Sequence, residues 1–115
     1  MVKRTKGARI MNIKKKKEVW IGLVGITEQG NMNLLEGAEG AFANVLTIAS
    51  DFDEFKDHAV EFLNTMGLVI TEIEDVESFT NRQSKNILDQ EVIEKAERVA
   101  RTGKTEITTL HLYDS

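Results

Sequence analysis

A predicted helix that begins near residue 51 carries the side chains best suited to chemistry in this sequence. Three carboxylates and one imidazole project within about 80° of one another at the helical turn of 100° per residue. These residues are Asp51, Glu54, His58 and Glu61. Such groups on successive turns can ligate a divalent cation, but their stripe lies about 110° from the apolar stripe and therefore faces solvent. We expect no metal ion here and assign the stripe to contact with a partner.

A second group of acidic residues lies at the end of a predicted strand. It consists of Glu72, Glu74, Asp75 and Glu77. Paired carboxylates perform acid–base chemistry when their surroundings separate their pKa values, but nothing in the adjoining sequence desolvates one member selectively. A focused negative potential does accelerate encounter with a positive surface. We therefore expect a solvated strand end and assign it, with the helix stripe, to partner binding.

The usual signatures of catalysis are missing from the sequence. The chain has no cysteine, and no Gly-x-Ser-x-Gly motif presents an activated hydroxyl, so nucleophilic catalysis has little support. The paired glycines that suggest a phosphate loop lie within or before predicted strands rather than before a helix. We expect a binding protein rather than an enzyme, and we expect no cofactor.

An alternative prediction places a small-ligand cleft between the segment 27–40 and the C-terminal strand. Its lining would be Trp20, Met32, Leu34 and His111. His111 would act there as a base or a binding group, whereas the commoner state of a strand histidine is half-buried and hydrogen-bonded. Under this alternative the domain binds a small ligand or has a regulatory role, and an enzymatic activity stays open.

Hydrophobic periodicity predicts the elements that position these residues. Apolar runs predict strands over 19–26, 41–49, 68–76 and 104–113. An amphipathic helix is predicted after Asp51, which forms a capping box with Glu54, and it ends at Gly67. A second helix is predicted from Asp89 to Gly103, and the polar segment 78–88 before it is expected to be a loop.

The element order β-β-α-β-α-β predicts an α+β fold. We expect a two-layer sandwich in which a four-stranded, mainly antiparallel or mixed sheet carries two helices on one face. Alternate positions of the strand over 41–49 are small (Ala41, Ala43, Val45 and Ala49), which predicts close packing of a helix on that face. The strand over 19–26 is apolar on both sides, so we expect it at the centre of the sheet or covered on both faces.

The net charge of −4 combines two regions of opposite sign. Residues 1–17 hold eight of the fifteen basic residues and no acid. Residues 18–115 hold the other seven bases and all nineteen acids, a net charge of −12. We expect residues 1–17 to be a disordered basic arm and residues 18–115 to be a single acidic α+β domain. Met11 is also a plausible first residue of the chain, which leaves open whether residues 1–10 are an extension.

The charge distribution also selects among classes of partner. Residues 18–115, with a net charge of −12, repel the phosphates of nucleic acid. Only the basic arm is able to attract them. The apolar run over 19–26 is far shorter than the roughly 20 residues of a membrane span, and no cleavage pattern follows it. We expect a cytoplasmic chain without membrane contact, and a sheet-mediated homodimer is compatible with these features.

These observations favour a small acidic, non-enzymatic domain that binds the surface of a basic protein partner. In size and charge the chain resembles the bacterial immunity proteins that neutralise nuclease toxins. That resemblance implies acidic residues that occupy a site built for phosphate. No motif carries the resemblance, and no residue role is taken from it.

Overall fold

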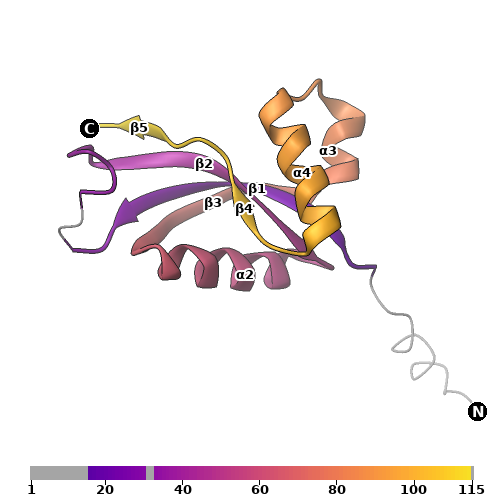
Figure 1. Ribbon diagram of the computed structural model, residues 1–115, viewed down its shortest axis with the longest axis horizontal. Coiled ribbons are helices and arrows are strands. Elements are labelled where there is room, and N and C mark those ends of the chain that lie inside the picture. Colours follow the sequence, from indigo (N-terminus) through magenta and orange to yellow (C-terminus); the bar gives the residue numbers. More distant parts are fainter. Residues whose placement is uncertain (1–15, 31–32, 115) are drawn as a thin grey trace, which may run out of the picture.

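The computed structural model of the chain describes residues 16–30 and 33–114 (Figure 1). Met32 and residues 1–15, which make up most of the predicted arm, lie outside the described residues. The elements in chain order are β1 (Glu18–Glu28), β2 (Gly40–Ala49), α2 (Phe52–Thr65), β3 (Leu68–Ser78), α3 (Phe79–Lys85), α4 (Gln90–Thr102), β4 (Glu106–Ile107) and β5 (His111–Tyr113).

The strands form one antiparallel sheet in the order β3-β1-β2-β4, and β5 also pairs with β2. The central position of β1 agrees with its sequence, because a strand flanked on both edges and covered on both faces gains from apolar residues throughout. Ile21, Val24 and Ile26 of β1 are almost completely buried. The predicted α+β sandwich class and the antiparallel sheet are confirmed.

Local capping explains where α2 begins and ends. Asp51 is its N-cap, and the Asp51 Oδ1 atom accepts a hydrogen bond from the Glu54 backbone N–H at 2.9 Å. The Glu54 carboxylate completes a variant of the predicted capping box, because it accepts from the backbone N–H of Ser50 at 2.7 Å. Gly67 follows the helix with φ of +78°, a left-handed conformation that glycine adopts without steric cost.

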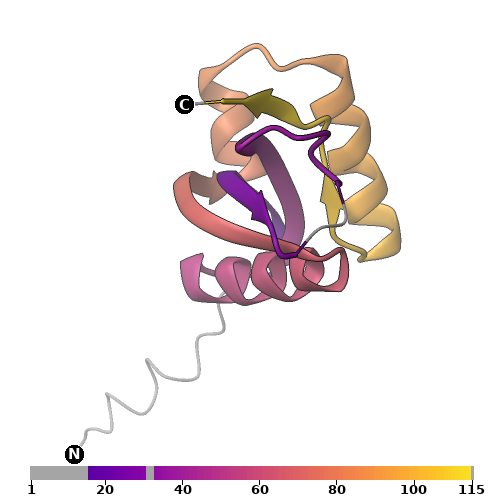
Figure 2. The ribbon, with the colours of Figure 1, turned by 90° about the vertical axis from the view of Figure 1, so that its left-hand side faces the viewer.

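The helices cover opposite faces of the sheet (Figures 1 and 2). Phe55, Ala59 and Leu63 of α2 pack against the small face of β2, as its alternate alanines predict. The neighbouring position Leu46 points the other way and packs with Val99 of α4. The prediction of two helices on one face is therefore wrong in this detail, because β1 and β2 are apolar on both sides and require cover on both.

Two further differences concern the segments on either side of α4. The expected loop over 78–88 contains the helix α3, whose N-cap Ser78 accepts from the Asn81 backbone N–H at 3.1 Å. The expected strand over 104–113 is divided into β4 and β5. Between them Thr109 donates its backbone N–H to Glu91 of α4 at 2.8 Å, which draws the chain out of the regular pairing. The sheet consequently has five strands rather than four.

Candidate functional site

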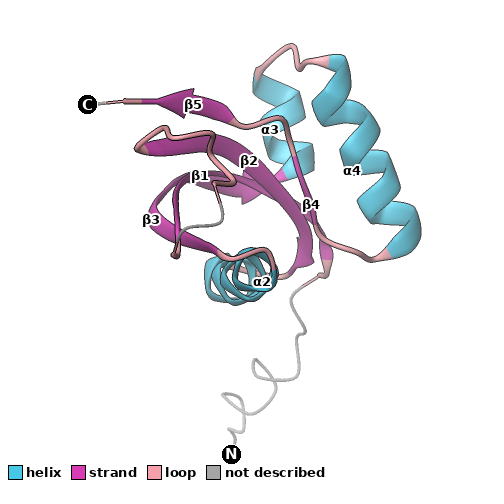
Figure 3. Ribbon diagram, turned by 60° about the vertical axis from the view of Figure 1, so that its left-hand side comes forward, coloured by secondary structure: helices cyan, strands magenta, loops and turns pink. Residues whose placement is uncertain are grey.

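The half of the sheet face that α3 and α4 leave bare is the first candidate surface. Figure 3 shows both helices gathered at one end of the strands. Strand register places side chains of β1, β2, β3 and β5 together on the remaining half. We define the open sheet face by these residues: Leu23, Phe42, Val69, Glu72, Glu74, His111 and Tyr113.

Aromatic and aliphatic groups form the centre of the open sheet face. The rings of Phe42 and Tyr113 stack with their centroids 5.1 Å apart. Leu23 lies opposite Glu74 in the pairing of β1 with β3, and Val69 remains 37% exposed. The face therefore combines partly exposed apolar groups with carboxylates along its β3 side, a composition common in protein-binding surfaces.

Glu72 and Glu74 face one another on β3. Hydrogen bonding and charge repulsion from Glu72, with a smaller contribution from Asp75, raise the pKa of Glu74. The residues that the structure describes provide no cationic partner for either side chain. These two carboxylates therefore hold an uncompensated negative charge at the surface.

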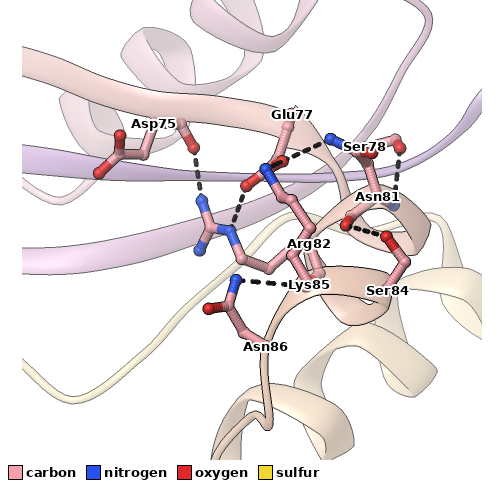
Figure 4. Close-up of polar contacts among 8 residues, drawn as sticks. All are labelled: Asp75, Glu77, Ser78, Asn81, Arg82, Ser84, Lys85 and Asn86. Carbon is pink, nitrogen blue, oxygen red and sulfur yellow. Dashed lines mark hydrogen bonds and ion pairs between the residues drawn. The ribbon is translucent and has the colours of Figure 1, made fainter.

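Glu77 has a different role, although it belongs to the same predicted cluster (Figure 4). Its carboxylate forms ion pairs with Arg82 and, at 2.7 Å, with Lys85 of α3. Asn81 donates a further hydrogen bond to it. These donors lower the pKa of Glu77 to about 2. Its side chain is only 16% exposed. Glu77 therefore holds α3 against the sheet, and its charge is neutralised within the domain.

An irregularity at Asp75 places Glu74 and Glu77 on the same face of the sheet, although they are three residues apart on β3. The φ of Asp75, +53°, lies in the left-handed region, and the pairing of β1 with β3 shifts register at this point. Glu74 lies opposite Leu23 on the open sheet face, whereas Glu77 lies opposite Ile21, where α3 supplies its cationic partners. Arg82 also donates to the backbone carbonyl of Asp75, which holds this irregularity in place (Figure 4).

The predicted stripe on α2 serves mainly to build local structure. Asp51 caps the helix, and Glu54 accepts from Ser50 and pairs with Lys17, which lowers the pKa of Glu54. The Nδ1 atom of His58 lies 2.9 Å from the carbonyl oxygen of Ile48. Within residues 16–30 and 33–114, no three histidine or acidic side chains group in a way that could hold a metal ion.

The residues of the alternative pocket are not gathered around one cavity. Trp20 packs on the α2 side of the sheet, whereas His111 pairs with Phe42 on the opposite face. Leu34 is 40% exposed in the connection after β1, where its neighbour Leu35 is fully buried. Met32 lies outside the described residues.

A cleft that the sequence did not predict lies between α2 and the segment joining α4 to β4. Its volume is about 590 Å³, and its polar lining includes Thr47, His58, Glu61, Lys104 and Thr105. The hydroxyls of Thr47 and Thr105 lie 2.7 Å apart at its floor and tie the segment to β2. These residues come from separate parts of the chain, and among them only His58 and Glu61, both on the predicted helix stripe, gave a signal in the sequence.

No known protein family, curated protein or solved structure shows a significant match to this chain. Among the described residues, no helix has the length and apolar character needed to cross a membrane.

Proposed function

We propose that this protein is a small acidic interaction domain that binds a basic protein partner, in the manner of bacterial immunity proteins. The observation that carries the proposal is the pair formed by Glu72 and Glu74 on the open sheet face. Glu72 raises the pKa of Glu74, so keeping both carboxylates charged at neutral pH costs the free domain free energy. A cationic side chain from a partner would remove that cost, because it converts a repulsive pair into an attractive cluster.

The contrast with the other carboxylates supports this assignment. Glu77 pairs with Arg82 and Lys85, and Glu106 pairs with Lys95 and Arg98. Each of these acids is neutralised within the domain. Glu72 and Glu74 lie instead beside the partly exposed Leu23 on the open sheet face. A partner with lysine or arginine around an apolar centre would complement both features.

A second copy of the chain is a less suitable occupant of this surface. β3 forms one edge of the sheet order, and it carries Glu72, Glu74 and Asp75. Antiparallel pairing of two β3 edges would bring like charges together, and the register shifts along the strand also discourage it. We therefore favour a different, basic partner over a homodimer, and light scattering should give the mass of one chain.

The proposal is tested by affinity capture at low salt from cells that make the protein, followed by titration with the purified partner. The wild type is compared with the variant Glu72→Gln/Glu74→Gln and with the control Glu94→Gln/Glu97→Gln, which removes two exposed charges from α4. We expect a basic protein that the wild type and control bind and the first variant binds at least tenfold more weakly. Equal binding by all three proteins would refute the proposed surface.

The expected cytoplasmic location belongs to the same proposal and is tested by cell fractionation.

The alternative function, small-ligand binding, gains support from a specific observation, although not at the residues first expected. That observation is the cleft beside His58.

A further inference from the structure

The cleft between α2 and residues 103–105 brings together two opposite charges that do not neutralise each other. Glu61 and Lys104 both line it. Neither side chain forms an ion pair with any residue in the described part of the chain, and the two are not within ion-pair distance of one another. The space between an acid and a base in one cleft can therefore admit a molecule that carries both charges.

His58 adds a hydrogen-bonding group of defined polarity. The Ile48 carbonyl oxygen can only accept, so its contact with Nδ1 at 2.9 Å requires a proton on that nitrogen. In the neutral ring the second nitrogen, Nε2, is then an acceptor. His58 and Glu61 are three residues apart on α2 and thus lie on the same side of the helix. Together they form an acceptor end of the cleft, suited to an ammonium group.

The opposite wall supplies the donors. Lys104 follows Gly103, whose φ of +74° ends α4 and turns the chain towards β2. The bond between Thr105 and Thr47 then holds this wall in position, since Thr47 is only 1% exposed. Lys17 also lines the cleft but already pairs with Glu54. Lys104 is therefore the principal cation available to a carboxylate.

Apolar groups occupy the remaining surface. Ile48 and Phe62 line the same cleft, and Phe62 also packs against the main core. The volume of about 590 Å³ is within the range of small-molecule sites in proteins. An apolar side chain on the ligand would cover these groups while its two charges meet the two walls.

We propose that this cleft binds a small zwitterion with an apolar side chain, of the α-amino acid class. The ammonium group contacts Glu61 and His58 Nε2, and the carboxylate contacts Lys104. This site is separate from the open sheet face. Failure to bind a zwitterion and failure to bind a basic protein partner are therefore independent results.

The decisive comparison uses three probes of the same shape with the wild-type protein. Leucine carries both charges, 4-methylpentanoate carries only the carboxylate, and 3-methylbutylamine carries only the ammonium group. Binding is followed by the NMR shift of the His58 ring protons. We expect leucine to bind about tenfold more tightly than either singly charged probe, because each of these loses one charge-assisted contact. Equal affinities, or a His58 signal that leucine does not move, would overturn the proposal.

Variants locate the two ends of the ligand. Glu61→Gln should weaken leucine binding about tenfold while leaving 4-methylpentanoate binding unchanged, and Lys104→Met should weaken leucine and 4-methylpentanoate alike. The matched controls are Glu36→Gln and Lys56→Met, which remove exposed charges outside the cleft and should leave all affinities unchanged. If the controls weaken leucine binding as much as the cleft variants, general electrostatics explains the binding and the assigned site is wrong.

Discussion

Glu74 and Glu77 stand three residues apart on β3, yet their pKa values shift in opposite directions. Repulsion by Glu72 raises the pKa of Glu74, whereas Lys85 and Arg82 lower the pKa of Glu77 to about 2. Residue type does not distinguish the two acids. The neighbours that the fold gives each of them decide whether it forms ion pairs within the domain or carries an uncompensated charge.

Replacement of Glu77 should show that it stabilises the fold. A carboxyl whose pKa falls from 4.5 to about 2 on folding contributes its full stability above pH 4.5, and the contribution is lost as the pH falls through about 2. We expect Glu77→Gln to lower the free energy of unfolding by about 1.5–3 kcal/mol at pH 7, and by much less near pH 2. Urea unfolding at both pH values measures this. A loss of the same size at both would contradict the ion-pair explanation, and exposed Glu97→Gln serves as the control.

Replacement of Glu72 should change the stability of the domain in the opposite direction to replacement of Glu77. A carboxyl whose pKa rises on folding opposes folding at a pH above that pKa, and the penalty disappears as the pH falls and the group protonates. We expect Glu72→Gln to lower the pKa of Glu74 and to raise the stability of the free protein at pH 7. Carboxyl NMR titration and urea unfolding follow the two effects. An unchanged pKa of Glu74 in this variant would show that the two side chains do not interact.

At the scale of elements, the close approach of α2 to β1 depends on a missing side chain. A Cβ atom at Gly22 would lie 2.7 Å from the Phe55 ring and 2.8 Å from Val76. Phe55 is fully buried, so its ring has no free space into which to move. The small-residue pattern of β2 predicted a closely packed helix, but the equivalent role of Gly22 in β1 became visible only from the packing.

Gly22→Ala should therefore separate α2 from the sheet. We expect a loss of about 1–3 kcal/mol in the free energy of unfolding, which is typical of overpacked cores. A second substitution, Phe55→Leu, makes room for the new methyl group and should cost less in the Gly22→Ala background than in the wild type. A double-mutant cycle by urea unfolding measures the coupling. Strictly additive effects would show that the two positions are not in conflict.

The helix α3 was missed because the residues of its short polar segment have no apolar periodicity. Phe79–Lys85 has no buried residue, and its start depends on the Ser78 cap and on the ion pairs of Glu77. Ser78→Ala should therefore destabilise the domain by about 1 kcal/mol. Hydrogen exchange should show faster exchange at the Asn81 amide, which bonds to Ser78. Unchanged exchange at this amide would contradict the capping role.

At the scale of the whole molecule, the charge of the chain is divided between a body and an arm. Six of the basic residues lie within residues 1–15. Deletion of this segment should abolish weak binding of duplex DNA at low salt, because the remaining surface is strongly acidic. Before deletion, the plot of log affinity against log salt should have a slope no steeper than about −7, since the eight cations of residues 1–17 contact at most eight phosphates. Fluorescence anisotropy measures both, and DNA binding that survives the deletion would place a nucleic-acid site on the body.

The α+β class, the main helices and strands and the sign of the net charge follow from the amino-acid sequence. Periodicity, capping at Asp51 and glycine stops at Gly67 and Gly103 are properties of short windows, so they can be read without knowledge of the fold. The tertiary structure alone decided which acids stay unpaired and which distant groups share a cleft. The packing of α3 gives Glu77 two cationic partners and leaves Glu74 without one among the described residues, and the approach of residues 103–105 to α2 brings Lys104 into the cleft lined by Glu61. Electrostatic and hydrogen-bonding partners depend on distances of a few ångströms in space, and spacing along the chain does not specify them.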